Sequence, residues 1–250
     1  MKNFIIKPFW LLLIVIFLVW EKSAAGLNSL ILPSPEETYL ALKEITLSGV
    51  LLSSFIITLR RTIIAYGLAV LAGVITALLL HRFNLLKKTF RPLITIVQAT
   101  PPVVWVSLAV VWFGVADDLT PIFLIFIVSV PVIFVNIFQG LEEMNRELIE
   151  MAKAYSTPNR RIIKEIYFPS LLPALVSALS VAFAFAWKSS VFAEFVASSS
   201  GIGYQLSRAN SMLATDRLFA WTIILILFML FVEYYLLEKL KEKVSRWKNG

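Results

Sequence analysis

The chain contains no cysteine and only one histidine, His81. The absence of cysteine excludes a disulfide framework and any metal site built from thiolates. One histidine is too few for a multi-histidine metal site such as the H-E-x-x-H motif. The sequence also lacks the G-x-x-x-x-G-K-[S/T] loop that cradles nucleotide phosphates. If the protein uses ATP, the nucleotide must therefore bind to a partner subunit.

Charged residues are also scarce, at 16% of the 250 residues, whereas hydrophobic residues make up 59%. The mean hydropathy of +0.82 is far above that of a soluble domain of ordinary composition. The composition therefore predicts an integral membrane protein that lies in a lipid bilayer.

Six apolar stretches predict one all-α transmembrane domain over residues 1–250. Roughly 20 apolar residues in a helix are enough to cross the hydrocarbon of a bilayer. The predicted spans cover about residues 4–20, 56–80, 92–113, 119–138, 171–196 and 218–237.

The first of these stretches has two possible interpretations. Lys2 and Lys7 precede an apolar run that ends in small residues at 23–25, which is typical of a cleavable secretory signal peptide. The alternative is an uncleaved first span. We favour the span, because a protein with several further spans needs no removable signal.

The distribution of lysine and arginine predicts the orientation in the membrane. Most of the 23 basic residues fall in the N-terminus, in residues 81–91, in residues 141–170 and in the tail after residue 237. Basic residues concentrate in the cytoplasmic loops of membrane proteins. Both termini are therefore predicted to be cytoplasmic. The net charge of +7 then reflects topology and does not call for a nucleic-acid partner.

The longest polar interval runs from Leu141 to Pro173 and contains two predicted short amphipathic helices. Ser156, Thr157 and Pro158 separate them, with Thr157 predicted as the N-cap and Pro158 as the first helical residue. The apolar positions of the first helix are Leu141, Met144, Leu148, Met151 and Ala152, and those of the second are Ile162, Ile163 and Ile166. Pro169 is predicted to end the second helix. The interval is either a solvated loop or a surface that docks another protein.

The residues within this interval resemble a known signature. Glu150-Met151-Ala152, then Ser156, Ile166 and Phe168-Pro169, are similar to the E-A-A…G…I-x-L-P signature of ABC importer permeases. Two positions depart from it, because Met151 replaces the second alanine and Ser156 replaces glycine. A glycine would adopt a left-handed helix end at little cost. Serine can adopt it at a penalty on the order of 1 kcal/mol.

Two further segments resemble the nitrate, taurine and sulfonate group of these permeases. Leu32-Pro33-Ser34-Pro35, followed by two glutamates, matches an L-P-S-P element and also predicts a helix start. The segment 199–204, S-S-G-I-G-Y, is similar to an S-G-L-G segment and is predicted to be a flexible exit from the fifth span. With the signature, these matches cover nearly the whole chain in matching order.

The resemblance implies a type I ABC importer (MetI-like) permease core with one added N-terminal span and a cytoplasmic coupling helix. It implies a second permease copy as a homodimer, two ATPase subunits that hold ATP and Mg²⁺, and an extracytoplasmic substrate-binding protein. It implies no catalytic residue, cofactor or metal on this chain, and a bacterial-type cytoplasmic membrane. The ATPase-coupling residues that it implies are Glu150, Met151, Ala152, Ser156, Ile166 and Pro169.

The resemblance also implies that the third span helps to line a translocation pathway, and two charged residues of the fifth span are further candidates. The candidate residues are Gln98, Pro101, Pro102, Lys188 and Glu194. The tandem prolines remove two backbone donors and predict a kink, which serves either the pathway or packing alone. Lys188 is expected either to attract an anionic solute or to balance Glu194 across a helix interface. Each charge must face protein, water or a partner, because ionised groups are costly at bilayer depth.

The cargo predicted by the resemblance is a small organic or inorganic anion such as a sulfonate, taurine or nitrate. The alternative within the same permease group is a thiamine-precursor pyrimidine or a related heterocycle. An ion-coupled secondary transporter would also have several spans with intramembrane charges. Such transporters typically show an internal repeat, and we find none in this sequence.

Overall fold

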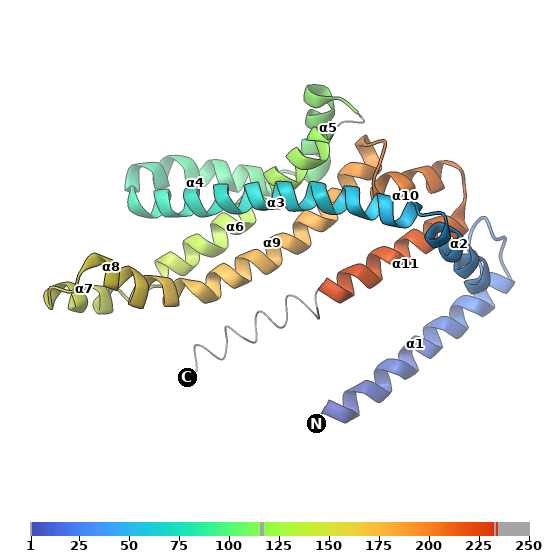
Figure 1. Cartoon of the computed structure of the whole chain (residues 1–250), viewed down its shortest axis with the longest axis horizontal. Helices are drawn as coiled ribbons and strands as arrows, with labels where there is room; N and C mark the ends of the chain where they lie inside the picture. Colours follow the sequence, from blue (N-terminus) through green and yellow to red (C-terminus); the bar gives the residue numbers. More distant parts are fainter. Residues whose placement is uncertain (1, 116–117, 233, 235–250) are drawn as a thin grey trace.

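The computed structural model describes residues 2–115, 118–232 and 234, with side chains from Trp10 onward. The secondary structure of this part of the chain is helical throughout (Figure 1). The elements are α1 (Lys2–Ala25), α2 (Pro35–Leu47), α3 (Val50–Arg82), α4 (Asn84–Ala99), α5 (Pro102–Phe113), α6 (Leu119–Glu142), α7 (Arg146–Ala154), α8 (Asn159–Ile162), the π-helix η1 (Ile163–Tyr167), α9 (Phe168–Ala197), α10 (Ile202–Ser211) and α11 (Thr215–Phe231).

Three long helices, α3, α6 and α9, pack against one another and form the core. Small side chains line their contacts: Ala69 and Ala77 of α3 and Ala178 and Ala182 of α9 are completely buried. Larger apolar residues of α6, including Ile133, fill the space between them. Small residues bring helix axes close together, which is how helices associate where lipid removes the hydrophobic drive.

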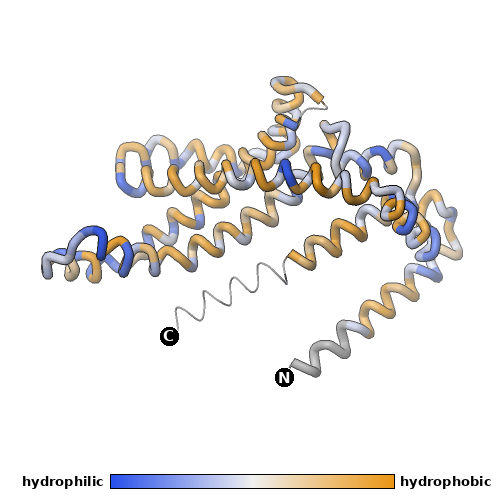
Figure 2. The backbone as a smooth tube through the Cα atoms, in the orientation of Figure 1, coloured by the Kyte–Doolittle hydropathy of each residue, from blue (hydrophilic) through white to orange (hydrophobic). Residues whose placement is uncertain are grey.

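Among the described residues, three segments are long and apolar enough to cross a membrane without a break: Val50–Arg82, Leu119–Glu142 and Asn159–Ala197. They contain the predicted spans 56–80, 119–138 and 171–196. Figure 2 shows hydrophobic residues along most of these helices and hydrophilic residues gathered toward their ends.

The predicted span 92–113 is a broken span, and the kink predicted at Pro101-Pro102 is confirmed. It is divided between α4 and α5, which are bent by 96° relative to each other. Thr100 is extended, as expected for a residue before proline. Pro101 and Pro102 have no amide hydrogen to continue the ladder. Counted as one broken span, the pair raises the number of apolar crossings in the described chain to four.

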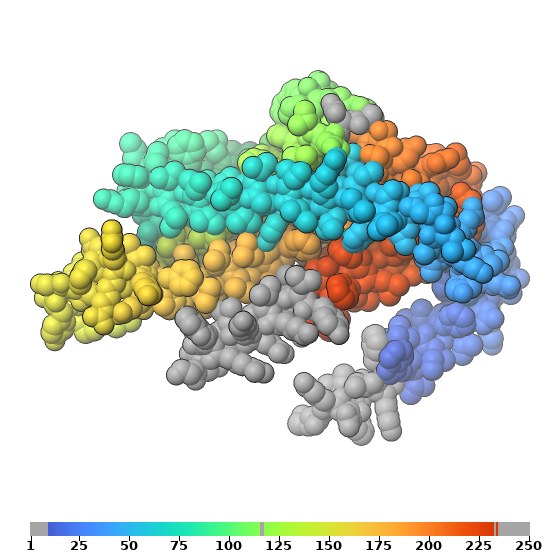
Figure 3. Space-filling view, in the orientation of Figure 1, coloured from blue at the N-terminus to red at the C-terminus, as the bar shows by residue number. Residues whose placement is uncertain are grey.

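The first and last predicted spans lie in α1 and α11. Residues 4–20 lie within α1, whereas the predicted end of the last span at residue 237 is outside the described residues. Figures 1 and 3 show α1 standing away from the main body. Trp20 lies near the C-terminal end of α1 and connects this end to the rest of the molecule. Its indole ring stacks on Phe219, with the ring centroids 5.9 Å apart, and its N–H donates to the Pro33 carbonyl at 2.9 Å.

The helix start predicted at the L-P-S-P element is confirmed in α2. Ser34 is the N-cap, and Pro35 occupies the first helical position. The Ser34 hydroxyl accepts from the Glu37 amide at 3.1 Å, and the Glu37 carboxylate accepts from the Ser34 amide at 2.8 Å. This reciprocal capping box satisfies two amides at the helix end.

Candidate functional site

The segment 141–170, the coupling segment, connects the end of α6 to the start of α9. It consists of α7, α8 and η1 and forms a projecting end of the molecule, coloured yellow in Figure 3. Asn145 begins α7 as its N-cap, and its side chain accepts from the amides of Glu147 and Leu148. The only residue of α7 that is buried is Ile149.

The prediction that the residues from Leu141 to Ala152 form one helix with a single apolar face is wrong. Leu141 belongs to α6, which continues to Glu142, and the chain breaks before α7 starts at Arg146. The break changes the register, so Ile149 turns inward. Leu148 and Met151 instead face outward, with 45% and 53% of their surface exposed.

Three exposed apolar residues therefore follow one another along α7 and its C-cap, and we call them the coupling patch. Leu148, Met151 and Tyr155 are spaced by three and four residues, which places them on one helical face. Tyr155 is 81% exposed. An apolar group presented on a polar segment is typical of a docking surface.

The end of α7 has the left-handed turn that the signature requires. Ser156 has a φ of +55°. Its amide donates to the Lys153 carbonyl at 2.9 Å, and the Thr157 amide donates to the Ala152 carbonyl at 3.0 Å. These two hydrogen bonds define a Schellman motif. Serine therefore makes the turn that glycine is expected to make, and Ala152 supplies one of its carbonyls.

The second half of the coupling segment differs from the prediction in two details. The residue before the first helical position is Pro158, not Thr157, because α8 starts at Asn159 and the Pro158 carbonyl accepts from the Ile162 amide at 3.1 Å. Pro169 does not end the helix. It lies in the first turn of α9, directly after the π-helix η1 that contains the half-buried Ile166. The wider π turn accommodates a proline that would otherwise clash with the carbonyl four residues earlier.

Glu150 is exposed on α7 and has no ion pair among the described residues. It lines a polar pocket of about 240 Å³ that also contains His81, Arg146 and Lys153. Arg161, in α8 of the same segment, is paired with Glu165 at 2.9 Å. Glu150 is therefore a carboxylate at the surface of the coupling segment that remains available to a basic group of another protein.

A second site lies at the other end of α6, where a buried ion pair joins α3 to α9. The Arg61 guanidinium is 3.0 Å from the Glu194 carboxylate, and the two side chains are 2% and 0% exposed. Arg61 also contacts Asp118, the residue that precedes α6, with 2.7 Å between Nε and Oδ1. Arg60 forms a further ion pair with Asp118 from a more exposed position.

The same ion pair organises the segment between α9 and α10. Arg61 donates to the Ser200 carbonyl at 2.9 Å. The Glu194 carboxylate accepts from the Thr58 hydroxyl at 2.8 Å and from the Gly203 amide at 3.1 Å. A Cβ built on Gly201 would lie 2.4 Å from that carboxylate. The prediction of a flexible exit at 199–204 is therefore wrong, because hydrogen bonds and close packing hold this segment against the side chains of Arg61 and Glu194.

The predicted pathway residues are not gathered in one place. Gln98, Pro101 and Pro102 are exposed around the α4–α5 bend. Lys188 is exposed on α9 and lines an apolar pocket of about 500 Å³ between α9 and α11, which contains none of the other predicted pathway residues. Glu194 pairs with Arg61 and not with Lys188.

Sequence reasoning missed Thr58 and Arg61 as partners of Glu194, and it missed Asp118 as a partner of Arg61. The available signal was an arginine within a long apolar helix, because an ionised side chain at such a position requires a partner. The partner itself is 133 residues away in the sequence, and no local pattern identifies it.

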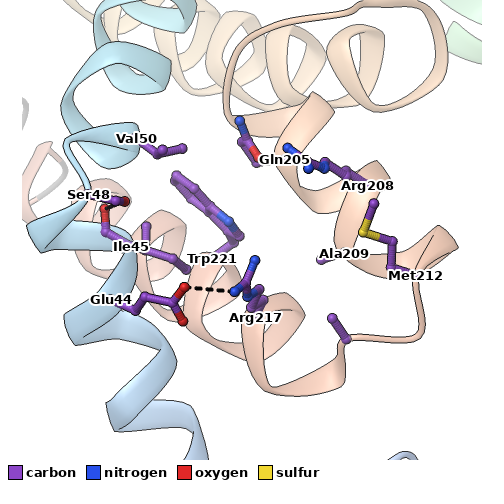
Figure 4. A pocket seen from close by; sticks show the side chains of 11 residues that line it. Glu44, Ile45, Ser48, Val50, Gln205, Arg208, Ala209, Met212, Arg217 and Trp221 are labelled. Carbon is purple, nitrogen blue, oxygen red and sulfur yellow. Dashed lines mark hydrogen bonds and ion pairs between the residues drawn. The ribbon is translucent and has the colours of Figure 1, made fainter.

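A smaller pocket of about 190 Å³ lies between α2, α10 and α11 (Figure 4). The ring of Trp221 lies at its centre, and Glu44 forms an ion pair with Arg217 at 2.8 Å across it. Arg208 extends from α10 on the opposite side. Figure 1 shows α2 and α10, two of the helices that line this pocket, at the end of the molecule away from the coupling segment.

Comparison with known proteins assigns the chain to a family. Residues 69–239 match the family described as the inner membrane component of binding-protein-dependent transport systems. The chain belongs to this family. It is therefore a multi-pass inner-membrane permease of a binding-protein-dependent ABC importer, and ATP hydrolysis takes place on a separate subunit. This assignment removes the ion-coupled secondary transporter.

Individual relatives agree with this assignment over most of their length. The permease is 25% identical to the aliphatic sulfonates transport permease protein SsuC of Bacillus subtilis, over 94% of this chain and 86% of that protein. It is 30% identical to an ABC transporter permease protein of Methanocaldococcus jannaschii (83% and 79%). It is 23% identical to the taurine transport permease TauC of Escherichia coli (94% and 87%).

Solved structures show that the permease has the MetI-like fold. A chain of the MetNI methionine ABC transporter aligns with a TM-score of 0.68 at 16% identity, covering 80% of this chain and 98% of that one. A chain of an amino acid ABC transporter aligns with a TM-score of 0.62 at 19% identity (83% and 97%).

Proposed function

We propose that the coupling segment docks on the ATPase subunits of the importer and transmits their closure to the membrane helices. In this arrangement six spans place both termini in the cytoplasm, on the same side as α7. Nucleotide binding can shift the permease between two states only through a difference in affinity for them. The coupling segment is suited to transmit the change in the ATPase to the membrane helices, since it connects α6 directly to α9 along the chain.

The surface of α7 is the observation that carries this proposal. It presents the coupling patch beside Glu150, a carboxylate without an ion pair in the described chain. Apolar side chains supply the contact area, and the charge fixes the orientation of the partner. The Schellman turn at Ser156 sets the direction in which α7 is presented.

The experiment compares the parent with Glu150→Arg after reconstitution with the ATPase and the substrate-binding protein. We expect ligand-loaded binding protein to stimulate ATP hydrolysis in the parent, and we expect the variant to lose that stimulation or the ATPase itself. Glu143→Arg is the matched control, because Glu143 is an exposed carboxylate outside α7. Equal stimulation of Glu150→Arg and the parent would show that Glu150 is not the coupling contact.

A second copy of the permease is expected to cover the exposed face of α9. Val181, Phe185 and Lys188 follow one another on this face and are all exposed. A lysine left in contact with lipid at this depth would cost about 2.5–3.5 kcal/mol on insertion scales. In a homodimer with a water-filled pathway between the two copies, each Lys188 faces water and this cost is removed.

The solute proposed for this pathway is a small anion of the sulfonate or taurine type. The names of SsuC and TauC refer to aliphatic sulfonates and taurine, and Lys188 would attract a sulfonate group. A pyrimidine precursor of thiamine is the alternative cargo, and it would draw no benefit from this cation. The end that bears α2, α10 and the pocket of Figure 4 is then extracytoplasmic, where the binding protein would dock.

A further inference from the structure

A basic pocket lies beside the first three turns of α4. Its volume is about 630 Å³. It is lined by Asn84, Lys87, Lys88, Arg91, Pro92 and Thr95. Three of these six residues are cationic, and the pocket contains no acidic side chain.

Two of the three cations are held in place by α6. Lys87 forms an ion pair with Glu142, and its Nζ lies 5.0 Å from the centroid of the Phe138 ring. The Arg91 guanidinium lies 5.7 Å from the same ring. Lys88 has no ion pair among the described residues. The site therefore has an excess of positive charge, because the Glu142 carboxylate is the one acidic group that pairs with its three cations in the part of the chain that the structure describes.

The position of the pocket corresponds to a membrane surface. A single residue, Phe83, separates α4 from the end of the membrane-crossing helix α3 at Arg82. The two helices then run side by side (Figure 1). The first turns of α4, which carry the three cations, therefore lie at the level where α3 leaves the hydrocarbon. Figure 1 shows the connection between α3 and α4 at the same end of the molecule as α7.

The rest of α4 presents hydrocarbon to its surroundings. None of its residues is buried. Beyond the cations, Leu93 and Ile96 are 52% and 60% exposed. A helix with cations at its membrane-surface end and apolar side chains along its length matches both parts of a phospholipid. A soluble anion would use only the cations.

We propose that the pocket of Lys87, Lys88 and Arg91 binds the phosphodiester headgroup of an anionic phospholipid, whose acyl chains lie along α4. The site rests on the membrane orientation in the proposed function, in which this end faces the anionic cytoplasmic leaflet. Lys87 and Arg91 are pre-ordered by α6, so little side-chain entropy is lost when the phosphate binds. A lipid bound here would stabilise the packing of α4 on α6, directly beside the coupling segment.

The test measures lipid retention by the purified full chain in detergent, using native mass spectrometry. Phosphatidylglycerol and phosphatidylcholine with identical acyl chains are the two probes. The parent is expected to retain phosphatidylglycerol preferentially. Lys88→Gln/Arg91→Gln is expected to reduce that retention by about fivefold for each basic residue removed. Lys153→Gln/Arg160→Gln is the matched control, because it removes two exposed cations from the coupling segment, and it should behave like the parent.

Three results would overturn the proposal: equal retention of the two lipids by the parent, an unchanged preference in Lys88→Gln/Arg91→Gln, or displacement of phosphatidylglycerol by millimolar inorganic phosphate. The last result would mean a simple anion site. Because no ATPase is present, the outcome is separate from that of the Glu150→Arg experiment. Glu150→Arg itself should retain phosphatidylglycerol like the parent.

Discussion

Arg61 of α3 and Glu194 of α9 form an ion pair of 3.0 Å from which solvent is almost completely excluded. Arg61 also donates to the Ser200 carbonyl just before α10, and Glu194 accepts from the Gly203 amide in the first turn of α10. The pair therefore fixes three elements at once. Desolvating two charges is costly, and only such additional hydrogen bonds make the arrangement tolerable.

Removing one member of this pair is expected to be strongly destabilising. Arg61→Met strands the Glu194 carboxylate in the interior, and we expect the free energy of unfolding to fall by about 3–5 kcal/mol. Denaturant unfolding of the purified permease in detergent measures the change. Arg60→Met is the control, since the Arg60 side chain is 56% exposed and its ion pair with Asp118 should contribute no more than about 1 kcal/mol. Equal losses in the two variants would contradict a specific role for the buried pair.

The glycine at position 203 is expected to be irreplaceable for a steric reason. A Cβ there would lie 2.1 Å from the Val191 carbonyl oxygen and 2.7 Å from the Phe195 amide nitrogen, both of them backbone atoms. We expect Gly203→Ala to lower the free energy of unfolding by about 1–3 kcal/mol. At Gly67 of α3 a Cβ meets no atom within 4 Å, so Gly67→Ala should be neutral or stabilising by about 0.5–1 kcal/mol. Comparable unfolding curves for the two variants would contradict this packing.

The proposed homodimer predicts a specific cross-link. Because the chain has no cysteine, a single introduced cysteine reports its own environment. Phe185→Cys on α9 should form a disulfide-linked dimer in oxidised membranes, visible on a non-reducing gel. Ile75→Cys on α3 is the matched control with a similar exposure of 54% against 50%, and it should stay monomeric. A dimer band for Ile75→Cys alone would move the interface away from α9.

Lys188 is expected to influence the uptake of anionic solutes. In the reconstituted importer, Lys188→Gln should lower kcat/KM for taurine or an alkanesulfonate on the order of tenfold, because a cation in a narrow pathway raises the local anion concentration. Lys188→Arg keeps the charge and should transport at close to the parent rate. Lys22→Gln, at an exposed position near the end of α1 and outside the coupling segment, is the control. An unchanged uptake by Lys188→Gln would remove Lys188 from the pathway.

The coupling segment shows which local features the sequence could predict. The signature marks position 156 as a left-handed turn that glycine makes at little cost and that serine can also make. Ser156 makes the turn with a φ of +55°, because the turn depends only on neighbouring hydrogen bonds. The face of α7 was not predicted correctly. The break after Glu142 changed the register, and periodicity cannot locate such a break inside a continuous run of helix-forming residues.

The α4–α5 bend and the ion pair show a different limit. Pro101 and Pro102 guaranteed an interruption, yet the angle of 96° depends on how α4 and α5 pack against α6. Glu194 was recognisable as a charge that needs a partner. That the partner is Arg61 depends on the approach of α3 to α9.

The sequence by itself determined that this protein is an all-α membrane permease with a polar segment between apolar helices. Hydropathy, capping boxes and prolines act within a few residues, and they can be read along the chain. Only the tertiary structure decided which charges meet, which face of α7 is exposed and how the S-G-I-G segment is held. These outcomes depend on contacts between residues more than a hundred positions apart, such as Thr58 and Glu194, and such contacts leave no periodic pattern in the sequence.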